Sequence, residues 1–295
     1  MTGTPRALTI AGSDSGGGAG MEADLKAFAR CGVHGCAAIT AITAQNTLGV
    51  SAIHPIPPEI VLAQVRAVVA DVGIDVVKVG MLADAATIRA VAQALAELPS
   101  GTPVVVDPVM VAESGAELLQ PDARGVLVEE IVPLATVLTP NLPEARALLS
   151  HAAGKGASRA RETAGSDDAG VEVERLARGV LALGPVAVVL TGGHRKAAVD
   201  LLIDSREPER VVEIPGVRHP DGAAHGSGCT HSSVLAAQLA LGRSLRQAAF
   251  AARALTGAAI RDGLRDVGEG PGPVDVIGLA RIRAGEAPHG SVSPQ

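Results

Sequence analysis

The chain has 295 residues, 47% of them hydrophobic and 19% charged, which suffices for one large α/β domain or two small ones. Its net charge of −6, with no Trp or Tyr and only two Phe, argues against nucleic-acid binding through a basic surface or base stacking. The start does not resemble a signal peptide, and no apolar run is long enough to cross a membrane. We therefore expect a cytoplasmic protein.

Apolar runs of strand length alternate with helix-forming segments along the chain. The predicted strands cover residues 7–11, 36–42, 76–80, 104–106, 136–138, 186–190, 198–204 and 210–214, the last two as a hairpin-like pair at one edge. The predicted helices cover residues 21–31, 58–72, 85–98, 122–131, 142–149, 171–183, a segment that opens behind the 225–229 turn and stops at Gly242, and 245–263. Asp84 is expected to cap the helix that follows it.

This alternation predicts a three-layer α/β/α architecture with a mostly parallel central sheet, in one domain over residues 1–284. Residues 152–170 are poor in apolar side chains and are expected to form a mobile insertion, and residues 285–295 a disordered tail. Cys31 and Cys36, with His34 between them, lack a fourth metal ligand, so both are predicted to be core thiols.

A glycine-rich turn, His225-Gly226-Ser227-Gly228-Cys229, precedes one of the predicted helices. The first N–H groups of a helix have no partner within it, and the helix dipole adds partial positive charge, so the turn suits a phosphate. The same field would lower the pKa of a thiol and favour the thiolate. We predict a phosphate-holding turn with Cys229 as base or nucleophile; the alternative is a flexible loop that leads to a small buried cysteine.

Other polar residues are expected at the carboxyl ends of the strands, where open α/β sheets bind ligands. The Gly12–Gly20 loop lacks the spacing of a dinucleotide site, and its glycines more plausibly let the backbone approach a small ligand. Gln45 and Asn46 are expected in the polar loop that follows the predicted strand 36–42, and their amides either recognise a heterocycle or form a turn. Asp107 also ends a strand.

The acid Glu144 lies in the first turn of a helix that Asn141 is expected to cap. A carboxylate suits the helix dipole there, which is a sufficient structural reason for its presence. The predicted ligand edge collects Gly12–Gly20, Gln45, Met81, Asp107, Asn141, Gly192 and the 225–230 turn.

A series of short segments occurs in a characteristic order. The segments are AGSDSGGGAG at 11–20, AQNTLGV at 44–50, KVGML at 78–82, VVDPVM at 105–110, TPNLPEA at 139–145, GGH at 192–194 and HGSGC at 225–229. From about residue 7 to 275, the chain resembles the hydroxymethylpyrimidine/phosphomethylpyrimidine kinases of thiamin biosynthesis, in the ribokinase-like superfamily.

The resemblance implies transfer of a phosphoryl group from ATP to the hydroxymethyl group of 4-amino-5-hydroxymethyl-2-methylpyrimidine. A second transfer onto the monophosphate would give the diphosphate. It also implies a requirement for Mg²⁺ and a homodimer, with no nucleic-acid or membrane partner. Gln45 resembles the amide that binds the pyrimidine, and Gly12, Asp24, Met81 and Val109 resemble its neighbours in the pocket.

The remaining roles follow from the same resemblance. Asp107 and Glu144 resemble the acids that organise Mg²⁺ through water. The residues that would face the nucleotide are Asn141, Thr191, Gly192 and Gly193. The residues of the anion hole would be Gly226, Ser227, Gly228 and Cys229, with Cys229 in the position of the general base.

Two departures from the family pattern concern the residues expected to bind phosphate. Ser227 stands where the family usually has Thr, a mild change because both carry a hydroxyl. Thr191 stands where a Lys often neutralises ATP phosphates, and Arg195 or Lys196 could compensate. Two other functions therefore remain open, a pyridoxine/pyridoxal kinase and a non-catalytic pyrimidine-binding relative. A nicotinamide-dependent dehydrogenase is the least favoured alternative, because the glycine pattern does not fit a dinucleotide site.

Overall fold

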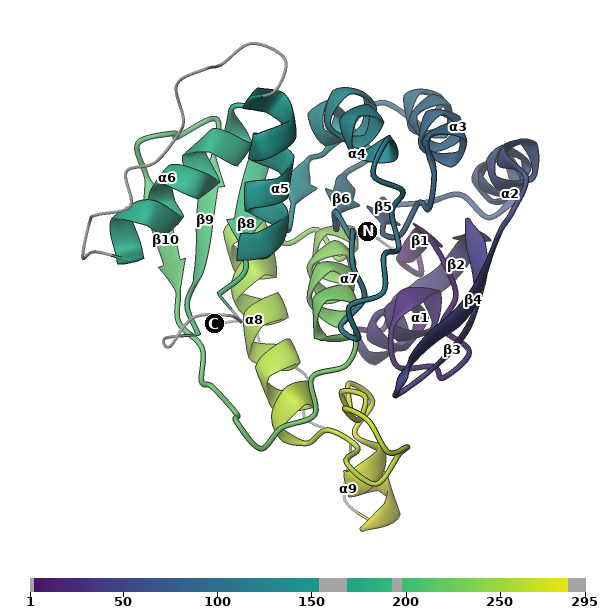
Figure 1. Ribbon diagram of the computed structural model, residues 1–295, viewed down its shortest axis with the longest axis vertical. Coiled ribbons are helices and arrows are strands. Elements are labelled where there is room, and N and C mark those ends of the chain that lie inside the picture. The colour runs from purple at the N-terminus through teal and green to yellow at the C-terminus, as the bar shows by residue number, and fades with distance from the viewer. Residues whose placement is uncertain (1–2, 154–168, 193–197, 286–295) are drawn as a thin grey trace.

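An eight-stranded sheet in the order β10-β9-β8-β7-β6-β5-β1-β2 runs through the molecule (Figure 1). The computed structural model describes residues 3–153, 169–192 and 198–285. The strands of this sheet are β1 (Arg6–Ala11), β2 (His34–Ile39), β5 (Val76–Val79), β6 (Val104–Val106), β7 (Val137–Leu138), β8 (Ala187–Leu190), β9 (Asp200–Asp204) and β10 (Val211–Ile214). Strands β8 to β2 in this order pair in parallel, and β9 and β10 add an antiparallel edge, so both sheet predictions are confirmed.

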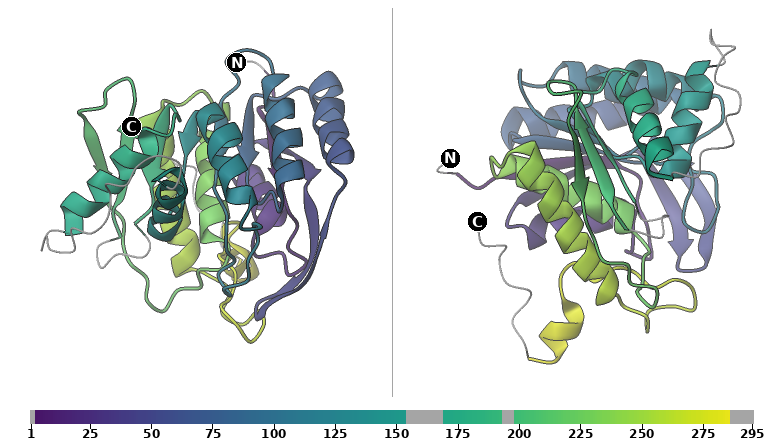
Figure 2. Two further views of the ribbon diagram at one scale, coloured as in Figure 1. Left: turned by 45° about the horizontal axis from the view of Figure 1, so that its top comes forward. Right: turned by 90° about the vertical axis from the view of Figure 1, so that its left-hand side faces the viewer.

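Helices cover both faces of the sheet (Figure 2). They are α1 (Gly20–Arg30), α2 (Pro58–Asp71), α3 (Ala85–Ala96), α4 (Ala123–Val126), α5 (Leu142–Ala153), α6 (Ala169–Leu181), α7 (Ser227–Ala240), α8 (Leu245–Arg261) and α9 (Leu279–Arg283). Apolar side chains of α2 to α6 form one core cluster with the sheet, and those of α1, α7 and α8 form a second. The predicted three-layer α/β/α architecture is thereby confirmed.

A second, two-stranded sheet lies to one side of the central sheet and was not predicted (Figure 1). Its strands are β3 (Ala41–Asn46) and β4 (Gly49–Pro55), which pair antiparallel. We expected Gln45 and Asn46 in a loop, whereas both lie in β3. Only one face of the hairpin packs against the protein, so buried and exposed residues alternate along β3. Its sequence therefore lacks the continuous apolar run from which a strand buried on both faces is recognised.

The predicted cap of the helix that follows Asp84 is confirmed. The Asp84 side chain caps α3 by accepting a hydrogen bond from the Thr87 N–H at 2.8 Å. Cys36 and Cys31 pack against the two core clusters, and among the described residues no group of side chains could form a three-ligand metal site. Among those residues, too, no helix has the length and apolar character needed to span a membrane.

The predicted insertion and tail cannot be compared with the structure. Residues 154–168 and 286–295 lie outside the described residues, and the helices α5 and α6 reach the two sides of the first gap.

Candidate active site

The carboxyl ends of the parallel strands bring the predicted ligand residues to one edge of the sheet. Gly12 follows β1, Met81 follows β5 closely, and Asp107 follows β6 directly. Beyond β7 and β8, Asn141 and Thr191 lie next to each other in an isolated parallel bridge. The architecture therefore places residues that are far apart in sequence along a single crevice, as expected for an open α/β sheet.

The N-terminus of α7 faces this edge. Gly226 precedes the helix with φ of +79°, a left-handed conformation that favours glycine. A Cβ at this position would also collide with the Gly18 carbonyl oxygen. The turn therefore packs closely on the glycine-rich loop 12–20, and the N-terminus of a 14-residue helix lies immediately behind it. Such a terminus suits an anion, in line with the predicted anion hole.

Asp14 folds the glycine-rich loop around its carboxylate. Its oxygens accept hydrogen bonds from the N–H groups of Gly16, Gly18 and Ala19 at 2.8–3.0 Å. The His225 ring nitrogen Nε2 lies 3.0 Å from the same carboxylate. Burial acts to raise the pKa of Asp14, and the bonds from His225 and the backbone outweigh it and lower the pKa.

His225 connects this loop to the loop after β6, since its Nδ1 lies 3.5 Å from Glu113. The bonds to Asp14 and Glu113 raise the pKa of His225 to about 9, so the ring is a cation at neutral pH. Sequence reasoning did not assign a role to these three residues. Asp14 and His225 lay within the motifs quoted above, but their pairing across 211 positions was not apparent.

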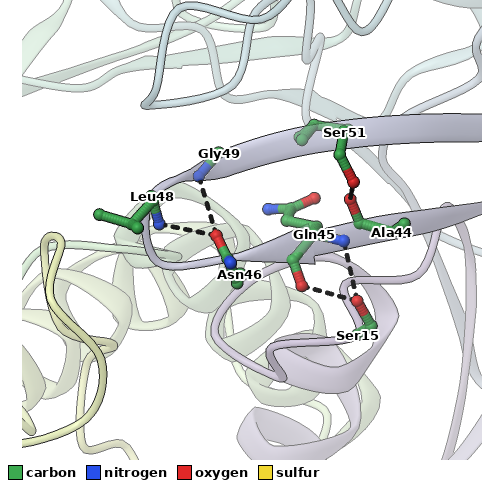
Figure 3. Close-up of a pocket in the computed structure, with 8 residues that line it drawn as sticks. Ser15, Ala44, Gln45, Asn46, Leu48, Gly49 and Ser51 are labelled. Atoms are coloured by element: carbon green, nitrogen blue, oxygen red, sulfur yellow. Dashed lines mark hydrogen bonds between the residues drawn. The ribbon is translucent and has the colours of Figure 1, made fainter.

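Gln45 borders an open hollow of about 510 Å³ between β3, β4 and Ser15 (Figure 3). Ser15 Oγ donates to the Gln45 carbonyl oxygen at 2.6 Å and accepts from its N–H at 2.8 Å. Thr43 Oγ1 donates to the Gln45 side-chain oxygen at 3.3 Å. The amide thus lies at the mouth of a cavity that is large enough for a small heterocycle.

Three of the four other predicted pocket residues lie near the edge of the sheet. Gly12 is buried against Met81, whose sulfur lies 2.8 Å from the position a Cβ would take on Gly12. Val109 is half-buried just after Asp107. Asp24 differs from the prediction, because its side chain is fully buried among other protein groups and has no surface to offer a substrate.

The acids Asp107 and Glu144 lie close enough to repel each other. Asp107 is 5% exposed, and its Oδ2 accepts from Ser232 Oγ at 3.1 Å. Glu144 and Asn141 cap α5 reciprocally, each side chain accepting from the other's N–H at 2.9 Å. Burial and the negative charge of Asp107 raise the pKa of Glu144 to about 8. Burial likewise raises the pKa of Asp107.

These carboxylates fit Mg²⁺ chemically. Mg²⁺ prefers hard oxygen ligands and is commonly held by one or two carboxylates, with water and phosphate oxygens completing the shell. A dication would relieve the repulsion between the two acids. Asp107 and Glu144 are therefore the residues that would hold the ion.

The predicted nucleotide residues are only partly described. The Thr191 N–H donates to the Pro140 carbonyl at 2.9 Å, which fixes Thr191 beside Asn141. The Gly192 N–H donates to Asp200 Oδ1 at 2.7 Å, so this amide points into the protein and not toward a nucleotide. Residues 193–197, which include Gly193, Arg195 and Lys196, lie outside the described residues.

The prediction that the helix dipole favours a Cys229 thiolate is wrong for this arrangement. Burial raises the pKa of the Cys229 thiol to about 12, and the charges of Asp24 and Asp107 act in the same direction. The Lys78 ammonium and a bond from the Gly20 N–H oppose this rise but do not cancel it. The sulfur is therefore a thiol at neutral pH, because desolvation outweighs the dipole.

Comparisons with known proteins identify relatives of this chain. The family model for phosphomethylpyrimidine kinase matches residues 14–275. A hydroxymethylpyrimidine/phosphomethylpyrimidine kinase of Rhizobium meliloti is 46% identical over 92% of this chain and 96% of its own length. The solved phosphomethylpyrimidine kinase of Clostridium difficile is 35% identical, with a TM-score of 0.68 over 84% of this chain and 96% of its own.

A second solved relative carries a different name. The pyridoxal kinase of Bacillus subtilis, solved as an ADP complex, is 34% identical with a TM-score of 0.78, over 94% of this chain and 99% of its own. Both solved relatives share the fold, whereas the family match and the higher sequence identity lie with the pyrimidine kinases. The chain therefore belongs to the phosphomethylpyrimidine kinase family.

Proposed function

We propose that this chain phosphorylates hydroxymethylpyrimidine and then its monophosphate, with ATP as the phosphoryl donor. The observation that carries the proposal is the path of the loop 12–20. At Ser15 the loop is bonded to Gln45 beside the hollow, and at Gly18 and Gly20 it contacts Gly226 and Cys229. One continuous segment thus joins a heterocycle-sized cavity to an anion-binding helix terminus, as a kinase of a small heterocyclic alcohol requires.

The groups of the chain have complementary tasks in this reaction. The Gln45 amide would bind the pyrimidine, and the α7 N-terminus would receive the phosphate oxygens. Mg²⁺ bound at Asp107 and Glu144 would neutralise phosphate charge. Phosphoryl transfer depends chiefly on such positioning and charge stabilisation, and a general base typically adds a factor of about 10²–10⁴.

Cys229 is proposed as that general base, which requires its thiolate. Because burial raises the pKa of Cys229 to about 12, the thiolate fraction at neutral pH is small and grows tenfold with each pH unit. Phosphoryl transfer through a loose transition state needs little help from a base, so a small fraction of thiolate is sufficient. Thr191 supplies no positive charge at its position, so the helix terminus and the cation would neutralise phosphate charge, and Arg195 or Lys196 could contribute.

Pyridoxal phosphorylation is the second candidate function. It is favoured by the likeness to the B. subtilis pyridoxal kinase, and none of the residues that line the hollow is aromatic. Aliphatic and amide groups discriminate weakly between two rings of similar size. The family resemblance also supports a homodimer in the cytoplasm, and sedimentation velocity would measure the oligomeric state.

A coupled assay of ADP formation tests the proposal with hydroxymethylpyrimidine, its monophosphate and pyridoxal as separate substrates at saturating Mg²⁺. Turnover on the first two, with the diphosphate identified by mass, is expected. Turnover on pyridoxal alone would replace the proposal with the second candidate. Binding of the pyrimidine without any turnover would instead indicate a non-catalytic relative.

A further inference from the structure

Lys78 is a fully buried lysine within the parallel sheet. It lies in β5 between Thr9 of β1 and Val105 of β6, and its side chain has no exposed surface. Val77 and Val79 on either side of it pack into the cluster beneath α2 to α6. Because side chains alternate along a strand, Lys78 faces α1 and α7 instead. A buried ammonium is strongly unfavourable unless it is paired.

The partner of this ammonium is Asp24 of α1. Lys78 Nζ lies 2.9 Å from each carboxylate oxygen of Asp24. Thr9 Oγ1 donates to one of these oxygens and Ser233 Oγ of α7 to the other, each at 2.6 Å. Both oxygens are therefore occupied by side chains from separate elements. Asp24 holds Lys78 in one place, which explains why it does not face the substrate.

This ion pair lies beside the reacting groups. Ser233 follows Cys229 by one helical turn on α7, and the adjacent Ser232 donates to Asp107. Burial raises the pKa of Cys229, and the charge of Lys78 is the largest influence that lowers it. At the Cys229 thiol the attraction of the ammonium exceeds the repulsion from Asp24. The pair therefore presents a net positive field to the site.

Stability alone does not account for a charge at this position. Replacing a buried ion pair by apolar residues of similar volume is often neutral or stabilising. Phosphoryl transfer, in contrast, gathers negative charge at the α7 N-terminus, next to the carboxylate of Asp107. A fixed cation beneath these groups offsets that charge in a poorly solvated place, where electrostatic interactions are strong.

We propose that Lys78 is a positioning residue of the active site, which acts through the Asp24 and Ser233 side chains, and that its buried ammonium, locked by Asp24, offsets the negative charge that the transferring phosphoryl group brings to Cys229 and Asp107. This inference rests on the proposed kinase function. In this view Asp24 acts on the site indirectly, by holding Lys78. Ser233 binds Asp24, and Ser232 binds Asp107.

Two variants separate the charge from the structure. Lys78→Met/Asp24→Asn removes both charges and retains one side-chain oxygen, which can accept from Thr9 or from Ser233. Asp24→Asn alone leaves the ammonium without its carboxylate. Arg66→Met/Glu97→Gln is the matched control, because it removes an exposed ion pair between α2 and the end of α3. Thermal unfolding establishes that each variant is folded.

Steady-state kinetics give the first readout. In the double variant we expect kcat to fall about 10–100-fold, while the KM values for ATP and hydroxymethylpyrimidine stay within about threefold, because Lys78 touches neither ligand. The control should retain all three constants. An unchanged kcat in the folded double variant would overturn the inference.

Alkylation of Cys229 by iodoacetamide gives a second readout that needs no turnover. Measured by peptide mass without nucleotide or Mg²⁺, it should be about tenfold slower in the double variant and faster in Asp24→Asn, since only the latter keeps the ammonium. A loosened structure would change both rates in the same direction, which would contradict the inference. If the double variant does not fold, Asp24→Asn alone decides the question. Alkylation of Cys229 that is no faster in Asp24→Asn than in the wild type would refute the role of Lys78.

These readouts also separate the inference from the proposed function. A wild-type chain that phosphorylates no pyrimidine refutes the proposed function. The alkylation rates would still decide whether the Lys78 charge acts on Cys229.

Discussion

The carboxyl group of Glu144 should make the stability of this protein fall as pH rises through neutrality. Glu144 lies in the first turn of α5, where burial and the charge of Asp107 raise its pKa from 4.5 to about 8. The folded protein therefore holds a proton that the unfolded chain has released. Glu144→Gln removes this titration and retains a side-chain oxygen to accept from the Asn141 N–H.

The sign and size follow from linkage between proton binding and folding. The favourable contribution of the protonated group is complete below the unfolded pKa of 4.5, and it is lost as pH rises toward the folded pKa of about 8. The full difference between the two pKa values corresponds to about 5 kcal/mol. Because Glu144 is partly exposed, solvent screening should reduce the loss to about 2–4 kcal/mol.

Urea unfolding at pH 5, 6, 7 and 8 in the presence of EDTA measures this loss. The wild-type free energy of unfolding should fall across the series, and that of Glu144→Gln should change much less. Glu172→Gln is the matched control, since Glu172 lies in the first turn of α6 but is exposed and paired with Arg146. Its slope should follow that of the wild type.

Mg²⁺ extends the same test. Because the ion would bind the ionised acids, it should stabilise the wild type more at pH 8 than at pH 6, and Glu144→Gln should lose most of this difference. Equal slopes for the wild type and Glu144→Gln in EDTA would refute the reasoning about the buried pair.

Further predictions concern the loops and helix α7. Cys229→Ala should lower kcat about 10²–10³-fold without changing thermal unfolding or ATP binding, and near-normal turnover would disprove its role as a base. Gly226→Ala should destabilise the protein by about 1–3 kcal/mol and abolish turnover. Gly257→Ala should instead stabilise α8 by up to about 1 kcal/mol, because a Cβ at this position would lie in open space. Calorimetry measures the stability of both variants. His225→Gln should cost about 1–2 kcal/mol at pH 7. Since the pKa of His225 is raised to about 9, the wild-type advantage should be complete below pH 6.5 and vanish above pH 9; a pH-independent difference in urea unfolding would contradict this. Gln45→Ala should raise the KM for hydroxymethylpyrimidine about tenfold and leave the KM for ATP unchanged. A raised KM for ATP with an unchanged KM for hydroxymethylpyrimidine would show that Gln45 does not bind the pyrimidine.

Much of this protein follows from short-range sequence patterns. The buried parallel strands were recognised from continuous apolar runs, because a strand covered on both faces needs apolar side chains in every position. The caps at Asp84 and Asn141 depend only on groups three residues apart, so they too could be predicted. The order of the motifs indicated the family, and the crevice followed from parallel strands that end at one edge.

Tertiary structure alone decided the electrostatics of the site. The pairing of His225 with Asp14, and of Lys78 with Asp24, joins segments that only folding brings together. The state of Cys229 was predicted incorrectly because the helix dipole is a local property, whereas desolvation and the nearby carboxylates depend on what the fold packs around the thiol. The hairpin of β3 and β4 was missed for a related reason. Its strands are held by each other and by loop 12–20, and these are long-range contacts that no periodicity in the chain records.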